Sequence, residues 1–229
     1  MGKFRAVIFD MDGVLVDSEP IFLNAINRLL TQENVGPLTE VENEMYFIGT
    51  TTGETLRRLK DMRRLPRSVD FYMAQYDIIV KQVLKEQLPP QPGVSRLLQG
   101  CRQRRLPKAV ASSSLRSWVD LKLEALGLQD AFEVVLGGDE ITHGKPAPDI
   151  YLLATQRLEV PPSECIAIED SPVGIAAAVA AGAYTVAVRT YSTRNLDLSQ
   201  AHTILDSLEL FDLALLADGP NPQPNLPPS

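Results

Sequence analysis

The sequence predicts an α/β fold, a doubly wound parallel sheet with an all-helical insert. Short apolar runs with strand character recur along the chain, helical patterns lie between them, and each run ends at polar or glycine residues. The strand-like runs cover residues 4–9, 108–111, 132–136, 165–168 and 184–188. Regular alternation of strand and helix indicates a parallel sheet covered on both faces. Ligands of such sheets bind beyond the carboxyl ends of the strands, where the polar residues of this chain lie.

Three segments between these runs predict helices, at residues 114–126, 148–158 and 172–181. The first places apolar side chains such as Trp118 and Val119 at helical spacing and ends at Gly127. The third ends at Gly182, a residue typical of the position just after a helix.

The stretch from about residue 20 to 87 breaks the alternation. Apolar residues such as Ile21, Ala25 and Leu29 keep helical spacing there, and no convincing strand is present. We therefore predict a core domain of residues 1–18 and 89–217 and a helical domain of residues 19–88. Residues 218–229 contain five prolines in twelve positions and are expected to be a disordered tail.

Composition excludes several classes of protein. The chain has 229 residues and a net charge of −7, and a chain of this size can bury roughly 70% of its surface. The negative charge argues against a nucleic-acid partner, and the apolar runs are too short for a membrane span. Cys101 and Cys165 form neither a metal-binding spacing nor a disulfide framework. We expect a cytoplasmic protein with reduced thiols and no signal peptide.

Acidic residues follow the first predicted strand and another one late in the chain. Asp10 and Asp12 precede Gly13, and Glu169 and Asp170 follow the run at 165–168. Asp-Gly after a strand is also an ordinary turn. However, neighbouring carboxylates are costly unless a cation neutralises them. Oxygen ligands with few His or Cys nearby favour Mg²⁺.

Two further clusters suggest phosphate chemistry. Ser112 and Ser113 lie where a strand meets a helix, a position that can bind an anion, although serines there also serve as ordinary helix caps. Lys145 is held between Gly144 and Pro146, which places it rigidly, although a lysine in a loop can equally be a plain surface residue. A lysine near so many carboxylates can balance charge and hold a phosphoryl oxygen.

Together and in this order, the clusters resemble the motifs of the haloacid dehalogenase superfamily. Residues 10–18 resemble its first motif, Ser112 the second, Lys145 the third and Glu169-Asp170 the fourth. The resemblance covers about residues 4–189, and the helical insert is similar to the family's cap. Residues 144–149 and 169–174 are closest to the subgroup of phosphoglycolate phosphatase-like enzymes and β-phosphoglucomutase.

The resemblance implies a Mg²⁺-dependent phosphomonoester hydrolase that acts on a small phosphorylated metabolite through an aspartyl-phosphate. Asp10 would be the nucleophile, and Asp12 would protonate the leaving oxygen and then activate water. Three further sets of residues have implied roles. The metal would be held by the carboxylates of Asp10 and Asp170 and the backbone carbonyl of Asp12, with Glu169 supporting its water shell or Lys145. Phosphoryl oxygens would be bound by Ser112, the backbone N–H of Ser113 and Lys145, and the cap loop at residues 49–53, including Thr52, would meet the substrate.

Departures from the subgroup narrow the activity. Asp12 is present, whereas members that act on carbon–halogen bonds lack an acid there. Phe22 stands where mutases usually have His, and Leu115-Arg116 replaces the Lys-Asn pair that they use for a second phosphate. A phosphatase is therefore favoured over a sugar phosphomutase, and a catalytically silent phosphate-binding module is a third hypothesis. Monomer and dimer both stay open.

Overall fold

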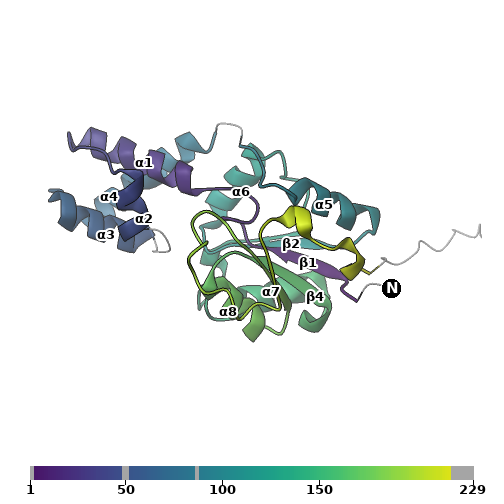
Figure 1. Ribbon diagram of the computed structural model, residues 1–229. Coiled ribbons are helices and arrows are strands. Elements are labelled where there is room, and N and C mark those ends of the chain that lie inside the picture. Colours follow the sequence, from purple (N-terminus) through teal and green to yellow (C-terminus); the bar gives the residue numbers. More distant parts are fainter. Residues whose placement is uncertain (1–2, 48–51, 86–87, 218–229) are drawn as a thin grey trace, which may run out of the picture.

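The computed structural model describes residues 3–47, 52–85 and 88–217 and contains a six-stranded sheet. The order of the strands is β3-β2-β1-β4-β5-β6, and every neighbouring pair is parallel. The strands are β1 (Ala6–Phe9), β2 (Lys108–Ala111), β3 (Val134–Leu136), β4 (Cys165–Glu169), β5 (Tyr184–Val188) and β6 (Thr203–Leu205). The predicted fold class, a doubly wound parallel sheet, is confirmed (Figure 1).

Helices cover both faces of the sheet. They are α5 (Val94–Gln103), α6 (Arg116–Ala125), α7 (Asp149–Leu158) and α8 (Pro172–Ala180). Side chains of β1 alternate between the two faces: Val7 and Phe9 belong to the core that includes α5 and α6, whereas Ala6 and Ile8 pack with α7 and α8. Single 3₁₀ turns lie at Gly138–Glu140, Pro162–Glu164, Leu208–Leu210 and Leu213–Leu215.

The register of the sheet brings the ends of β1 and β4 together. Phe9, the last residue of β1, pairs with Ile168 of β4 on one side and with Val110 of β2 on the other. The chain winds from β1 toward β3 in one direction and toward β6 in the other, so β1 is where the winding reverses. Ligands of open α/β sheets bind at this reversal, beyond the carboxyl ends of the strands.

Four helices form a separate layer beside the sheet, named here the helical layer: α1 (Glu19–Gln32), α2 (Glu40–Tyr46), α3 (Thr52–Arg63) and α4 (Val69–Val83) (Figure 1). The predicted apolar stripe of α1 is buried, including Ile21, Ala25 and Leu29, and it packs on α4. In the described part of residues 19–88 all regular structure is helical. The domain boundaries themselves stay a prediction.

Several details differ from the sequence-based expectations. Strand β6 was not predicted, because it has only three residues and none of them is buried. Phe4 lies outside β1 and instead forms an isolated bridge with Leu216. Helix α6 begins at Arg116 rather than at 114. The expected disordered tail at residues 218–229 lies outside the described residues.

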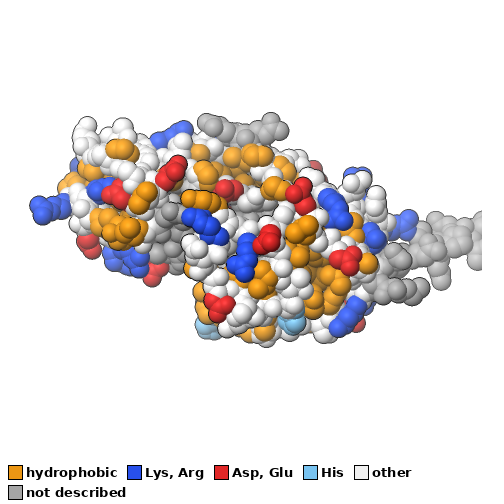
Figure 2. All heavy atoms as spheres, in the orientation of Figure 1, with side chains coloured by type: hydrophobic (Ala, Val, Ile, Leu, Met, Phe, Trp, Pro, Cys, Tyr) orange, Lys and Arg blue, Asp and Glu red, His pale blue; other side chains and the backbone are white. Residues whose placement is uncertain are grey.

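Acidic and basic side chains are interspersed over both parts of the molecule on the face shown in Figure 2. That face carries no continuous basic surface of the kind that nucleic acids require. Within the described residues, the helices all fall short of the length and apolarity needed to cross a bilayer.

Candidate active site

Three buried carboxylates meet at the carboxyl end of the central strands. Asp10 follows β1, Glu169 ends β4 and Asp170 comes next, and one carboxylate oxygen from each lies within 4.8 Å of the others. We call these three residues the acidic cluster. The parallel register explains the meeting, since adjacent parallel strands end at the same edge of a sheet.

Lys145 lies inside this cluster. Its Nζ is 2.6 Å from Asp10 Oδ1 and 2.5 Å from Glu169 Oε1, and only 4% of its side chain is exposed. Tyr151 of α7 donates its hydroxyl to the same Glu169 oxygen at 2.6 Å. Glu169 therefore orients Lys145, which is one of the two roles that the resemblance implied for it.

Burial and mutual repulsion shift the titration of the acidic cluster. Burial raises the pKa of Asp10 to about 7, with Lys145 opposing the shift and Glu169 adding to it. Burial and the charges of Asp10 and Glu169 raise the pKa of Asp170 well above its ordinary value. Burial alone would lower the pKa of Lys145, but the two carboxylates beside it raise it well above its ordinary value.

The charge balance of the cluster fits a divalent cation. Three carboxylates surround one ammonium, so the ionised group carries two uncompensated negative charges in a buried place. Its donors are all hard oxygen atoms, the set preferred by Mg²⁺. Asp10 and Asp170 are the side chains that would hold the ion, because Glu169 is already bound to Lys145, Tyr151 and nearby backbone N–H groups.

Two glycines let the backbone approach the carboxylates closely. Gly13 has a φ of 85°, and a Cβ there would overlap the carboxylate of Asp170. A Cβ on Gly174, in the first turn of α8, would overlap the carboxylate of Glu169. Thr190 Oγ1 donates to Asp170 Oδ2 at 3.3 Å, so Asp170 is confined on a second side.

Asp12 lies in a different environment from Asp10. Its Oδ1 accepts a hydrogen bond from Lys122 Nζ at 2.5 Å and its Oδ2 accepts one from Ser114 Oγ at 2.9 Å. The Lys122 side chain is fully buried, whereas that of Asp12 is 29% exposed. Burial favours the neutral acid, but the charge and hydrogen bond of Lys122 outweigh it and hold the pKa of Asp12 below its ordinary value. Asp12 is therefore ionised in this arrangement.

The predicted phosphate-binding residues divide into two groups. Ser112 is buried and its Oγ accepts the N–H of Ser114, while Ser113 is exposed at the same strand end. Thr52 is the first residue of α3, and in the described part of the chain no hydrogen bond or ion pair joins it to the acidic cluster. The neighbouring residues 49–51 of the predicted substrate loop lie outside the described residues.

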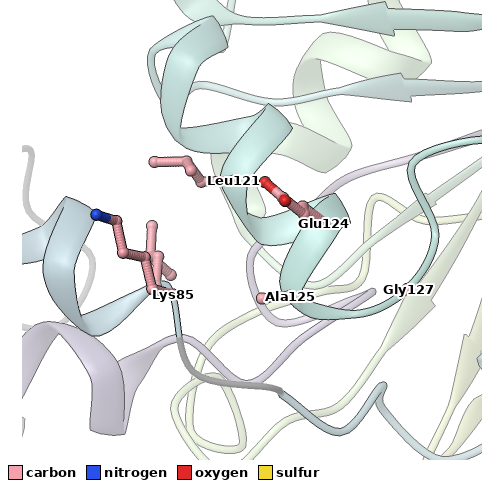
Figure 3. Close-up of a pocket in the computed structure, with 6 residues that line it drawn as sticks. Lys85, Leu121, Glu124, Ala125 and Gly127 are labelled. Carbon is pink, nitrogen blue, oxygen red and sulfur yellow. The ribbon is translucent and has the colours of Figure 1, made fainter.

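A cavity of about 430 Å³ lies elsewhere, where the chain returns from the helical layer to the sheet. Figure 3 shows Leu121 and Glu124 of α6 on one side of it and Lys85, just after α4, on the other. Among the described residues that line it, none belongs to the acidic cluster. This cavity is therefore separate from the acidic cluster.

The site combines two aspartates after β1, a buried lysine and a second acidic pair at the end of β4. In a doubly wound sheet with a helical layer, this combination defines a hydrolase of the haloacid dehalogenase type. The family model described as haloacid dehalogenase-like hydrolase matches residues 7–188, and the chain belongs to this family. The predicted resemblance is thereby confirmed.

Individual relatives agree with this assignment. The chain is 36% identical over 179 residues to a phosphorylated carbohydrates phosphatase of Thermotoga maritima, covering 78% of this chain and 82% of the relative. The crystal structure of a putative beta-phosphoglucomutase from Thermotoga maritima is similar with a TM-score of 0.77 and 31% identity, over 93% of this chain and 97% of that one. The structure of CbbY from Rhodobacter sphaeroides in complex with phosphate has a TM-score of 0.80 and 26% identity, over 90% and 96%.

Sequence analysis missed three residues of the site, Lys122, Tyr151 and Thr190, and it did not foresee the contact of Ser114 with Asp12. Lys122 had a usable signal, because it falls four residues after Trp118 and four before Leu126 on the apolar stripe of its helix. A lysine on a buried stripe needs a partner of opposite charge. Thr190 carried no comparable signal, since its role depends on the loop after β5 turning back toward Asp170.

Proposed function

We propose that the protein is a Mg²⁺-dependent phosphomonoester hydrolase that forms an aspartyl-phosphate on Asp10 and acts on a small phosphorylated metabolite. The observation that carries the proposal is the buried Asp10 carboxylate, held 2.6 Å from Lys145 beside two further carboxylates. Phosphatases among the relatives support the same class of reaction.

The reaction would proceed in two displacements. An oxygen of Asp10 forms a bond to phosphorus while the ester P–O bond breaks, and Asp12 supplies the proton that the leaving alkoxide needs. Asp12, then ionised, takes a proton from water, and that water attacks phosphorus and restores the Asp10 carboxylate. The ionised Asp12 described above is the form that the second displacement uses. Before the first displacement it would take up the proton that a phosphomonoester monoanion or solvent supplies.

Charge on the transferred phosphoryl group would be met by Lys145, Ser112 and the backbone N–H of Ser113. A bound magnesium ion would supply the positive charge that the acidic cluster lacks and that the phosphoryl oxygens also require. Thr52 and the loop before it are proposed to contact the rest of the substrate. A cytoplasmic location is proposed on the acidic composition and on Cys101 and Cys165, which are free and buried.

A sugar phosphomutase is the second candidate, favoured by the similarity to the putative beta-phosphoglucomutase structure. Such an enzyme must grip a second phosphate. Where mutases carry a Lys-Asn pair, this chain has Leu115 and Arg116. The Arg116 guanidinium is already bound to Asp120 at 2.8 Å and to the carbonyl of Val135 at 2.8 Å. This occupation argues for the hydrolase.

The test is phosphate release from a panel of phosphomonoesters, with Mg²⁺ and with EDTA, that includes β-glucose 1-phosphate. Metal-dependent release by the wild-type protein, abolished in Asp10→Asn, would support the proposal. Conversion of glucose 1-phosphate to glucose 6-phosphate with a bisphosphate primer, without phosphate release, would assign the mutase. Binding of phosphate esters with no turnover would assign the silent binding module.

A further inference from the structure

Lys122 is a buried charge that the proposed reaction does not use. The side chain lies on α6 and is fully buried. Burial of an ammonium group costs several kcal/mol before its partners are counted, so an apolar residue would fill the same space more cheaply. Lys122 therefore stands at a place where its charge or its hydrogen bonds have a use.

The contacts of Lys122 form a closed arrangement around Asp12. Lys122 Nζ donates to Asp12 Oδ1 at 2.5 Å and to Ser114 Oγ at 3.1 Å, and Ser114 Oγ donates to Asp12 Oδ2 at 2.9 Å. Each oxygen of the Asp12 carboxylate thus has its own donor. Two donors at two oxygens fix both the position of the carboxylate and its rotation.

The same ammonium also contacts the helical layer. The ring of Phe22 on α1 lies 5.0 Å from Lys122 Nζ, in cation–π geometry. One turn earlier on α6, Trp118 donates its indole N–H to Asp77 of α4 at 2.7 Å. Helix α6 therefore carries Lys122, which binds Asp12, and it also contacts helices α1 and α4 of the helical layer.

We propose that Lys122, together with Ser114, is a positioning residue that holds the Asp12 carboxylate where it exchanges protons with the leaving oxygen and with water. The inference rests on the proposed hydrolase function. Lys122 acts through Asp12 and does not itself reach the substrate, since its side chain has no exposed surface. Misplacing a proton-transferring group by about 1 Å can cost on the order of 10²-fold in rate.

The experiment compares two aryl esters that differ mainly in the basicity of the leaving oxygen, phenyl phosphate and p-nitrophenyl phosphate. The p-nitrophenolate ion departs without help from an acid, whereas phenolate benefits from a proton. We expect Lys122→Met to lower kcat/KM for phenyl phosphate on the order of 10²-fold and for p-nitrophenyl phosphate several times less. Ser114→Ala, which removes one hydrogen bond and no charge, should show the same selectivity with a loss of roughly three- to tenfold.

Lys108→Met is the matched control. Lys108 is also a buried lysine and forms an ion pair with Glu133, but it lies at the end of β2 that is far from the acidic cluster. This control variant should leave the ratio of kcat/KM for phenyl phosphate to kcat/KM for p-nitrophenyl phosphate unchanged. In the background of Asp12→Asn, Lys122→Met should cause no further loss of kcat/KM, because both substitutions remove the same function, proton transfer by Asp12.

Equal losses on both esters, or a further loss in the Asp12→Asn background, would overturn the positioning role and assign Lys122 to stability alone. If Lys122→Met does not fold, Ser114→Ala decides by the same criterion. A wild-type protein that hydrolyses neither ester would instead overturn the proposed function, which keeps the two failures distinguishable.

Discussion

Asp10→Asn should stabilise the protein when no divalent metal is present, although it should abolish turnover. Asparagine has the size of aspartate and resembles its protonated form. The pKa of Asp10 is about 7 against 3.8 for a free aspartate, and each pKa step corresponds to 1.36 kcal/mol, so ionised Asp10 costs about 4 kcal/mol above neutral pH. Protonation of the neighbouring Asp170 offsets part of this cost, so we expect a gain of about 1–4 kcal/mol.

Thermal unfolding of both proteins in EDTA at about pH 8 measures the effect. In a protein of this length each kcal/mol corresponds to about 2–4 °C, so Tm should rise by at least a few degrees. Addition of millimolar Mg²⁺ should raise the Tm of the wild type more than that of Asp10→Asn, because the variant has lost one of the carboxylates that would hold the ion. Asp130→Asn, at an exposed position, is the control for the loss of a negative charge and should change neither value.

A variant that is no more stable than the wild type in EDTA would refute this reasoning. The acidic cluster would then be stabilised by Lys145 as a structural ion-pair network, and the case for a cation drawn from its charge would fail.

Three other predictions concern pH, the contact between layers and the backbone of the site. Between about pH 3.8 and 7, and without metal, Asp10 is protonated in the folded protein but ionised in the unfolded chain. The free energy of unfolding should therefore fall as pH rises through this range, and the raised pKa of Asp170 acts in the same direction. Denaturant unfolding should show that the free energy of unfolding falls by about 2 kcal/mol between about pH 5.5 and 7.5. A value that does not change with pH would contradict the raised pKa of Asp10. Trp118→Phe should cost about 1–2 kcal/mol in urea unfolding, because Asp77 loses the indole donor at 2.7 Å, and an unchanged midpoint would show that this bond contributes nothing. Gly13→Ala should lower the free energy of unfolding by more than about 1 kcal/mol and kcat by more than about tenfold, because the φ of Gly13 is 85° and a Cβ there would displace Asp170. Thermal unfolding and turnover measure the two effects, and wild-type turnover would mean that the loop adapts freely.

The acidic cluster could be predicted from the sequence because its geometry follows from a general rule. Asp10 and Glu169 are far apart in the chain, but each ends a strand of a parallel sheet, and parallel strands place their carboxyl ends along one edge. That β1 and β4 are neighbours was not predicted and comes from the strand order of the structure. Lys145 could be predicted for a similar reason, since Gly144 and Pro146 mark a fixed loop before a helix.

The environment of Asp12 could not be predicted in this way. The helix after β2 was expected to begin at Ser114, but α6 starts at Arg116, and the hydroxyl of Ser114 donates to Asp12. A helical pattern gives the face on which Lys122 lies but not the rotation of α6 against β1, and that rotation decides whether the ammonium meets Asp12 or solvent. Similarly, β6 is a three-residue edge strand whose pairing depends on β5 being already in place.

The two aspartates of the first motif are separated by one residue, yet the fold drives their pKa values apart. Asp10 shares Lys145 with Glu169 and lies beside Asp170. The acidic cluster together with Lys145 therefore has a surplus of negative charge, and the pKa of Asp10 is raised. Asp12 has Lys122 to itself, so that pair is neutral and the pKa of Asp12 falls. Carboxyl groups placed in such contrasting environments can take different parts in one reaction. This charge surplus would attract a cation to the carboxylate of Asp10 and not to that of Asp12, whose proposed contribution to the metal is its backbone carbonyl. A bound cation would lower the pKa of Asp10, so that the proposed nucleophile is ionised at neutral pH. It follows that removal of Mg²⁺ and removal of the Lys122 charge act on different carboxylates: the first should suppress turnover of every ester alike, and the second should discriminate between leaving groups.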